Sequence, residues 1–127
     1  MDKQTFAGLP HPIALVVDDE PLILMNTADM VSEAGYHVIE ARTADEALAF
    51  LKQHNTLKLI VTDVQMPGRL NGIELANYIG EHWPDISIIV ASGAVIPEEG
   101  DLPTHARFLN KPINQELVLT TIRELCD

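Results

Sequence analysis

Several short apolar runs in this sequence end in polar residues that could carry out chemistry. An aspartate can act as a nucleophile toward phosphorus, and grouped carboxylates are the oxygen ligands that Mg²⁺ prefers. A hydroxyl and an ammonium group can bind the oxygens of a phosphoryl group. All of these groups follow apolar runs: Asp18, Asp19 and Glu20 after Ile13–Val17, Asp63 after 57–62, Ser92 and Gly93 after 86–90, and Asn110 and Lys111 after 106–109. Brought together, they would suit metal-assisted phosphoryl transfer to Asp63.

Each of these residues also has a purely structural interpretation. Asp18 and Asp19 precede Pro21 and could cap a helix, and Asp63 could simply begin a turn. A serine after a strand is a weak signal, and a single lysine such as Lys111 is usually a solvated charge. The coincidence of all of them at the ends of apolar runs favours a shared site.

Apolar runs alternate with amphipathic stretches along the chain, and this alternation predicts an α/β fold. Continuous β-branched runs are typical of strands buried on both faces of a parallel sheet. Strands are expected at 13–17, 36–40, 57–62, 86–90 and 106–109, with helices at 21–34, after Thr43, around 73–79 and across 113–125. We therefore expect a doubly wound, flavodoxin-like sheet of five parallel strands with helices on both faces. Ligands bind beyond the carboxyl ends of the strands in such sheets.

Several residues mark where these elements begin and end. Pro21 suits the first turn of a helix, and Gly35 suits the position just after its end. Thr43 and Glu46 have the spacing of a capping box. Met66–Gly68 reads as a turn.

The stretch between the fourth and fifth strands is poor helix material. Pro97, Gly100 and Pro103 stand within residues 94–104, and inside a helix a glycine costs about 1 kcal/mol and a proline about 3 kcal/mol relative to alanine. We expect a shortened or irregular fourth helix there, at most one turn from Pro97 to about Asp101. Such a segment should be mobile and easily remodelled.

Composition limits the classes of function. The 127 residues fit one domain, with a flexible leader at 1–12 and the domain at 13–127, and the net charge is −11. A nucleic-acid partner is not expected, because phosphate backbones require clustered lysine and arginine. Cys126 is the only cysteine, and neither a signal peptide nor a membrane span is evident. These features predict a cytoplasmic protein without a membrane partner.

The motifs taken together resemble the response-regulator receiver family, over about Ile13 to Cys126. The matching features are Asp18-Asp19 after the first strand, Asp63 with Met66-Pro67 after the third, Ser92 after the fourth and Lys111-Pro112 after the fifth. Asp19 and Asp63 are 44 positions apart, an interval typical of that family.

The resemblance implies a role for each residue of the acidic set. Asp63 would be the phosphorylated aspartate. Asp18 and Asp19 would hold Mg²⁺, directly or through water, with Asp63 as a further ligand. The backbone carbonyl of Gln65 would complete the metal site.

The resemblance also implies a switch. Ser92 and Lys111 would bind phosphoryl oxygens, and Gly93 would leave room for the phosphoryl group. Phe108 matches the switch aromatic, which would turn inward as Ser92 moves. A cis peptide bond is expected between Lys111 and Pro112.

The function implied is that of a phosphoacceptor in bacterial two-component signalling or a phosphorelay. A histidine kinase or histidine phosphotransfer protein would donate the phosphoryl group, docking on the helix near 22–30. The protein would not be an enzyme, and would be a monomer or weak dimer, either alone or as part of a hybrid kinase. The alternatives are a phosphatase with an aspartyl-phosphate intermediate and a degenerate receiver that only binds partners.

Two departures from the family pattern affect what the resemblance implies. One additional residue stands between Pro67 and Gly72, which widens a loop without touching the chemistry. Ser92 and Lys111 are 19 positions apart, a few fewer than usual. The missing residues fall at the fourth helix, so we expect the loop after Ser92, rather than a long helix, to report the switch.

Overall fold

The computed structural model describes residues 12–54, 56–65, 70–93, 96–98 and 100–126. The expected leader, apart from Pro12, and the expected Met66–Gly68 turn lie outside these residues. The elements are β1 Ile13–Val17, α2 Pro21–Glu33, β2 His37–Ala41, α3 Ala44–Gln53, β3 Leu59–Asp63, α4 Gly72–His82, β4 Ser87–Ser92, β5 Arg107–Asn110 and α5 Gln115–Cys126. None of the helices just named has the length and apolar character needed to cross a membrane.

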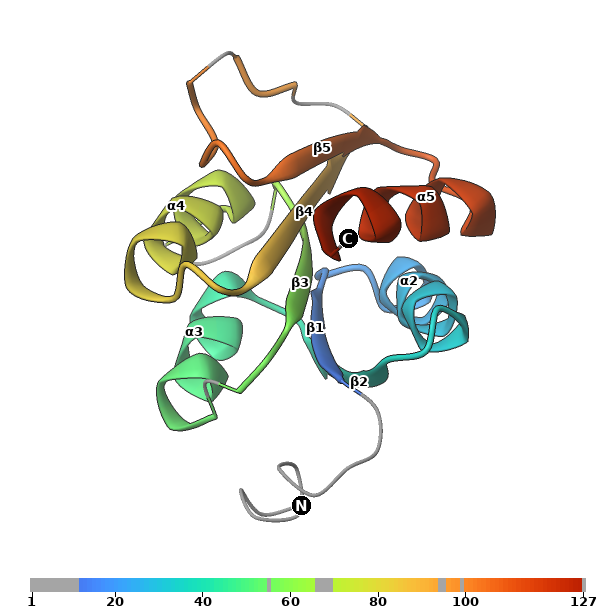
Figure 1. Ribbon diagram of the computed structural model, residues 1–127, viewed down its shortest axis with the longest axis horizontal. Helices are drawn as coiled ribbons and strands as arrows, with labels where there is room; N and C mark the ends of the chain where they lie inside the picture. The colour runs from blue at the N-terminus through green and yellow to red at the C-terminus, as the bar shows by residue number, and fades with distance from the viewer. Residues whose placement is uncertain (1–11, 55, 66–69, 94–95, 99, 127) are drawn as a thin grey trace.

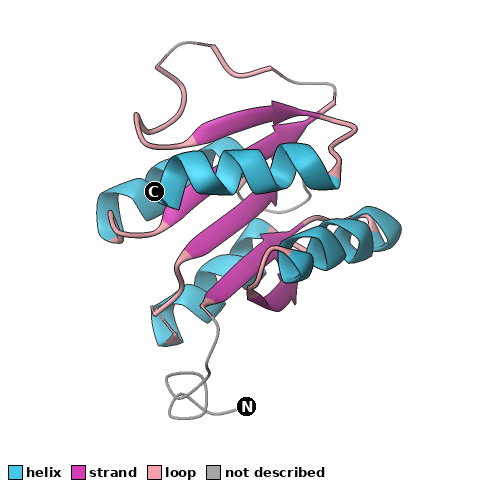
Figure 2. Cartoon of the chain, turned by 45° about the vertical axis from the view of Figure 1, so that its right-hand side comes forward, coloured by secondary structure: helices cyan, strands magenta, loops and turns pink. Residues whose placement is uncertain are grey.

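The strands form one parallel sheet in the order β2-β1-β3-β4-β5. Helices α2 and α5 cover one face of the sheet, and α3 and α4 cover the other (Figure 1). Figure 2 shows the strands as a central layer between the two sets of helices. This arrangement confirms the predicted doubly wound, flavodoxin-like α/β fold.

Alternation along the central strands supplies a core to both faces. In β1, Ile13, Leu15 and Val17 belong to the cluster under α3 and α4, whereas Ala14 and Val16 belong to the cluster under α2 and α5. Each large apolar side chain buried in this way contributes about 1.5–3 kcal/mol. The sheet is therefore a well-packed platform, and its strand ends can hold side chains in fixed positions.

The strand bounds differ from the sequence-based expectation by one or two residues. β3 begins at Leu59 instead of residue 57, and β4 runs on to Ser92. Ser92 therefore lies inside a strand, paired with Asn110 of β5. α5 begins only at Gln115, because the Asn114 side chain accepts a hydrogen bond from the Leu117 N–H at 2.8 Å and caps the helix.

The sequence predicts the cap at Thr43 but not the capping box at Asn71. Thr43 Oγ1 accepts a hydrogen bond from the Glu46 N–H at 3.0 Å, as expected for the start of α3. The complete, reciprocal capping box is instead at the start of α4, where Asn71 Oδ1 accepts from the Glu74 N–H and Glu74 Oε1 accepts from the Asn71 N–H. Gly35, just after α2, has a φ of 104°, which confirms it as the helix stop.

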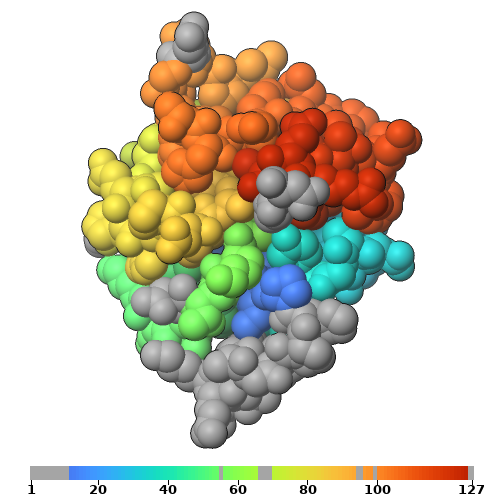
Figure 3. Space-filling model, in the orientation of Figure 1, coloured from blue at the N-terminus to red at the C-terminus, as the bar shows by residue number. Residues whose placement is uncertain are grey.

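The described residues between β4 and β5 contain no helix. Instead, the Asp101 N–H donates to the Glu98 carbonyl at 3.0 Å, and Asp101 Oδ2 accepts from the Glu98 N–H at 2.9 Å. Gly100 has a φ of 92°, which favours glycine. The segment projects beyond β5 (Figures 1 and 3). The expected irregular fourth helix is confirmed for these residues.

This segment rests on α4. Asn77 Nδ2 donates to the Asp101 carbonyl at 2.6 Å as well as to the Ile73 carbonyl of its own helix at 3.0 Å. Gly80 faces Pro103 so closely that an added Cβ would lie 2.9 Å from Pro103 Cγ. The connection between β4 and β5 is therefore supported by α4.

The Asn77 contact predicts the local stability of the segment. Asn77→Ala removes a hydrogen bond that contributes about 1 kcal/mol, so amide exchange at 101–106 should become about fivefold faster. Hydrogen–deuterium exchange measured by mass spectrometry tests this, with Glu81→Ala on the exposed side of α4 as the control. Unchanged exchange at 101–106 in Asn77→Ala would show that the contact does not hold the segment.

Candidate functional site

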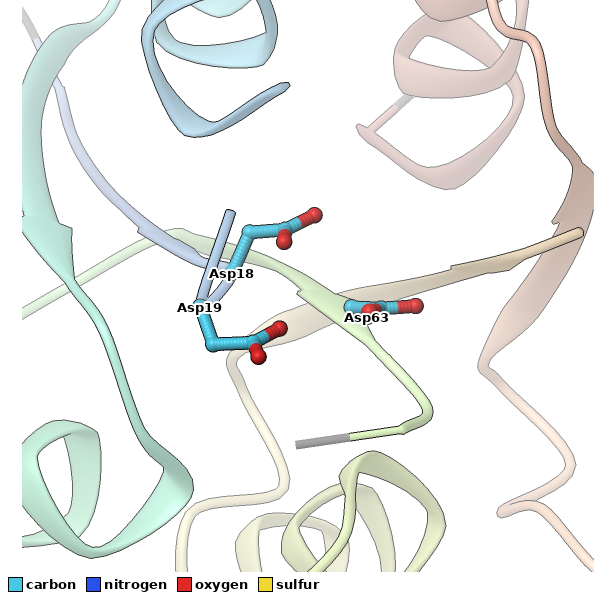
Figure 4. A group of neighbouring side chains, drawn as sticks. All are labelled: Asp18, Asp19 and Asp63. Atoms are coloured by element: carbon cyan, nitrogen blue, oxygen red, sulfur yellow. The ribbon is translucent and has the colours of Figure 1, made fainter. Parts of the chain in front are cut away.

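Strand pairing brings three carboxylates together at one edge of the sheet. Val17 of β1 pairs with Thr62 of β3, so the residues that follow, Asp18 and Asp63, are neighbours. Carboxylate oxygens of Asp18, Asp19 and Asp63 all lie within 4.8 Å of one another. Figure 4 shows the three side chains extending to the same side. Like charges at this separation repel, and burial weakens the screening by water.

Asp18 is the most restrained of the three. It is only 3% exposed, and its Oδ1 accepts a hydrogen bond from the Glu20 N–H at 3.0 Å. Its own N–H donates to the Ala41 carbonyl at 3.1 Å. The Glu20 side chain does not cap α2. Asp18 therefore orders the turn that leads into α2 but does not cap the helix, so the capping interpretation is wrong for Asp18.

Lys111 supplies the nearest positive charge. Its Nζ lies 2.9 Å from Asp18 Oδ2 and 3.4 Å from Asp63 Oδ1, and the three side chains are at most 19% exposed. The Lys111 N–H donates to the Ser92 carbonyl at 3.1 Å, and the Lys111–Pro112 peptide bond is cis, as predicted. Lys111 therefore ties the end of β5 to the acidic residues of β1 and β3.

The pKa values of Asp63 and Lys111 both lie above their ordinary values. Burial raises the pKa of Asp63, and Asp18 adds to this effect, although Lys111 and a hydrogen bond from the Val64 N–H at 2.8 Å oppose it. Burial alone would lower the pKa of Lys111, but its hydrogen bond to Asp18 and the charges of Asp18 and Asp63 outweigh burial and raise it. Lys111 is therefore held in its charged form beside a carboxylate whose ionisation is disfavoured.

The remaining predicted residues lie around this centre. Ser92 is buried at the end of β4, and Phe108 packs partly buried against the core cluster under α3 and α4. Strand alternation puts Ser92 and Phe108 on that side of the sheet, whereas Asp63 follows the side of α2 and α5. Gly93 and Gln65 are exposed. A Cβ added to Gly93 would lie 3.6 Å from Lys111 Cβ.

Sequence reasoning missed a close contact behind Asp63. A Cβ on Gly72, the first residue of α4, would overlap the Asp63 carbonyl oxygen and lie 2.9 Å from Val64 Cα. The Gly72 N–H donates to the Val64 carbonyl at 2.8 Å. α4 therefore begins directly against the backbone of Asp63. Nothing in the sequence distinguishes this glycine from an ordinary residue at a helix start.

Two buried hydroxyls at the site were missed as well. Thr62 Oγ1 donates to the Asp63 carbonyl at 2.9 Å, and Thr27 of α2 is buried next to Asp18 and Lys111. One feature of the sequence could have pointed to Thr27. It is a polar residue on the buried stripe of α2, whose other members, Leu24, Ala28 and Val31, are apolar.

The donor set fits a hard divalent cation. Three carboxylates within 4.8 Å of one another offer the oxygen ligands that Mg²⁺ and Ca²⁺ prefer. One ammonium offsets only part of their charge. A bound cation would relieve the repulsion that remains.

The raised pKa of Asp63 predicts how stability depends on pH without a divalent cation. Because the pKa in the folded protein exceeds the ordinary value of 3.8, the folded state loses stability as the pH rises from about 3.8 through the raised pKa. Asp63→Asn should therefore unfold at a higher denaturant concentration than the wild type at pH 7, with the difference disappearing near pH 3.5. Urea denaturation in a chelator tests this, and Asp29→Asn, an exposed change on α2, should have no comparable effect. A less stable Asp63→Asn at pH 7 would contradict the prediction.

Comparison with known proteins identifies relatives over most of this chain. NtrX, a nitrogen assimilation regulatory protein of Azorhizobium caulinodans, is 34% identical over 127 residues, which cover 92% of this chain and 26% of NtrX. The sensor kinase CckA of Brucella abortus is 32% identical over 117 residues, which cover 89% of this chain and 12% of CckA. The chain thus spans about a quarter or less of these curated relatives.

Solved structures share the fold. A response regulator receiver protein from Sinorhizobium medicae superposes with a TM-score of 0.85 at 24% identity, covering 93% of this chain and 96% of that one. The family model described as the response regulator receiver domain matches residues 14–123, which include the acidic cluster, Ser92 and Lys111. The chain therefore belongs to the response regulator receiver domain family of two-component signalling.

Proposed function

We propose that this receiver domain accepts a phosphoryl group on Asp63 and changes conformation in response. The observation that carries the proposal is the position of the Asp63 carboxylate, grouped with Asp18 and Asp19 and 3.4 Å from the Lys111 ammonium. A nucleophile, a cluster of metal ligands and a cation for phosphoryl oxygens are the parts that phosphoryl transfer requires.

The transfer forms one bond and breaks another. A carboxylate oxygen of Asp63 attacks the phosphorus of a phosphohistidine, and the phosphorus–nitrogen bond breaks with its electron pair remaining on the imidazole nitrogen. The Lys111 ammonium and the Ser92 hydroxyl bind phosphoryl oxygens, which carry the charge in the transition state. Asp63 ends as an acyl phosphate, so the domain modifies itself once rather than turning over substrate as an enzyme does.

Asp18, Asp19, Asp63 and the carbonyl of Gln65 are the residues that would hold Mg²⁺. Bound there, the ion supplies positive charge next to the incoming phosphoryl oxygens. Asp18 already uses Oδ1 for Glu20 and Oδ2 for Lys111, which favours contact between Asp18 and the ion through water. These residues fit Mg²⁺ because they supply three carboxylates, and because Lys111 leaves part of their negative charge unbalanced.

Ser92 and Phe108 would carry the response. Val90 pairs with Phe108 and Ser92 pairs with Asn110 across β4 and β5, so the two residues lie along the same face of neighbouring strands. If Ser92 moves toward a phosphoryl group, Phe108 can turn into the space that it leaves. The segment after β4, which rests on α4, would then be displaced.

The donor would be a histidine kinase or a histidine phosphotransfer protein that docks on α2. Leu22 and Met25 of α2 are 71% and 51% exposed. A cleft of about 330 Å³ lies between α2 and Lys111–Ile113, lined by Ile23, Met30 and Pro112 among others. This apolar surface adjoins the site, as a phosphohistidine donor requires.

The cellular setting belongs to the same proposal. A cytoplasmic location fits the single cysteine, and the net charge of −11 gives no support for binding nucleic acid or an anionic membrane. A bacterial source and a monomer or weak dimer complete this proposal. The similarity to the sensor kinase CckA supports a hybrid kinase as one context, and a separate regulator is the other.

Phosphorylation of Asp63 is the direct test. Incubation with acetyl phosphate and Mg²⁺ should add the mass of one phosphoryl group to the wild type and none to Asp63→Asn, because Asp63 is the proposed nucleophile, whereas both oxygens of Asp18 already accept hydrogen bonds. Intact-protein mass spectrometry measures the product, and Asp29→Asn should be labelled like the wild type. Equal labelling of Asp63→Asn would move the phosphoacceptor elsewhere.

Metal binding by the acidic cluster gives a second prediction. Asp19→Asn should bind Mg²⁺ at least about tenfold more weakly, since a ligand should matter no less than the outer groups that orient ligands. The same change lowers carboxylate repulsion, so without metal the variant should be at least as stable as the wild type. Calorimetric titration and thermal unfolding measure the two effects, and equal Mg²⁺ affinity in both proteins would place the site elsewhere.

A further inference from the structure

A small pocket lies at the site, lined in part by Asp18 and Asp63. Its volume is about 10 Å³, and its polar lining consists of Asp18, Thr27, Thr62, Asp63 and Lys111. Space of this size accommodates about one water molecule, provided that polar partners surround it. The pocket therefore has both the size and the lining of a site for a single buried water.

Thr27 is the unexplained member of this lining. It is 6% exposed and stands on the buried stripe of α2 between Leu24 and Val31, where a valine of the same shape would pack equally well. Thr121, the buried threonine of α5, donates its hydroxyl to the Leu117 carbonyl at 2.7 Å. Within the described part of the chain, the Thr27 hydroxyl makes no such bond. Because Thr27 lines the pocket, its hydroxyl can take a hydrogen-bond partner there.

At least one N–H group of the Lys111 ammonium is not accounted for by the contacts with Asp18 and Asp63. A lysine ammonium carries three N–H donors; one is donated to Asp18 Oδ2 at 2.9 Å, and the ammonium lies 3.4 Å from Asp63 Oδ1. Thr27 and Lys111 line this pocket together, and both also line the apolar cleft beside α2. The Thr27 hydroxyl and the Lys111 ammonium therefore border the same pocket, and a hydroxyl oxygen can accept a hydrogen bond.

We propose that Thr27 is a positioning residue for Lys111. Its hydroxyl accepts an N–H of the ammonium through one water molecule in the pocket, and fixes the ammonium between Asp18 and Asp63. The consequence for function rests on the proposed phosphorylation of Asp63. Phosphorylation of Asp63 removes the negative charge from its carboxylate oxygens. Thr27 and Asp18 then hold the ammonium where a phosphoryl oxygen can reach it.

The test compares Thr27→Val, which removes only the hydroxyl, with Thr27→Ser, which retains it. Thr121→Val is the matched control, because it removes a buried hydroxyl far from the ammonium. Nitrogen-15 NMR of the intact protein measures how fast the Lys111 ammonium protons exchange with water, and acetyl phosphate labelling at saturating Mg²⁺ measures the phosphorylation rate.

We expect Thr27→Val to speed ammonium exchange and to slow phosphorylation, each by about tenfold, as the loss of a hydrogen bond to a charged donor implies. Mg²⁺ affinity should stay within about twofold of the wild type, because Thr27 offers the metal no ligand. Thr27→Ser should restore both rates, and Thr121→Val should change neither.

The inference fails if Thr27→Val leaves ammonium exchange unchanged, or if Thr27→Ser loses as much as Thr27→Val, which would indicate packing alone. Its failure is distinguishable from failure of the proposed function. A wild type that is never labelled on Asp63 refutes the phosphoacceptor assignment, whereas the ammonium exchange still decides the role of Thr27.

Discussion

The crowding of three carboxylates at one end of a parallel sheet is the constraint on which this structure depends. The pairing of β1 with β3 makes Asp18 and Asp63 neighbours, and Asp19 completes a group whose oxygens lie within 4.8 Å of one another. Lys111 arrives from β5 and offsets one of the three charges. Burial, with Asp18 beside it, disfavours the ionised form of Asp63, and the negative charge that Lys111 leaves unbalanced favours a divalent cation.

The rest of the molecule holds the three carboxylates close together. It also offers two paths by which a change at Asp63 can reach the surface. Buried aliphatic side chains on both faces of the sheet hold the strand ends against the repulsion. On one side, Lys111 and Thr27 lie between the acidic cluster and the apolar cleft beside α2. On the other side, α4 begins against the Asp63 backbone at Gly72 and supports the β4–β5 connection through Asn77. The proposed donor surface and the proposed reporting segment thus lie on opposite faces of the sheet.

Much of this arrangement could be predicted from the sequence, because strong periodicity identifies strands and parallel strands share a carboxyl end. The fold, the sheet-end placement of Asp18, Asp63 and Lys111, the cis Lys111–Pro112 bond and the lack of a regular helix in the described residues between β4 and β5 all followed from local patterns or from the family resemblance. The contacts between distant segments did not follow.

Those contacts depend on distances that no local pattern encodes. The fit of Gly72 against Asp63 requires knowing how α4 packs, and the Asn77–Asp101 hydrogen bond joins residues 24 positions apart. The capping box was assigned to Thr43, because Thr-x-x-Glu fits the usual pattern, whereas the reciprocal pair belongs to Asn71 and Glu74. The strand bounds shifted because hydrogen bonding to neighbouring strands, rather than apolar content, determines where a strand such as β4 ends.

The central claim is that the Asp63 carboxylate is partly buried beside Asp18 and Asp19, so that its ionised form is disfavoured and a divalent cation stabilises it. Carbon-13 NMR titration of the Asp63 carboxyl group, with and without Mg²⁺, tests this claim most directly. Without a divalent cation Asp63 should titrate above its ordinary value of 3.8, and Mg²⁺ should lower its pKa, because the cation stabilises the ionised form. An Asp63 that titrates at its ordinary value and does not respond to Mg²⁺ would contradict the account.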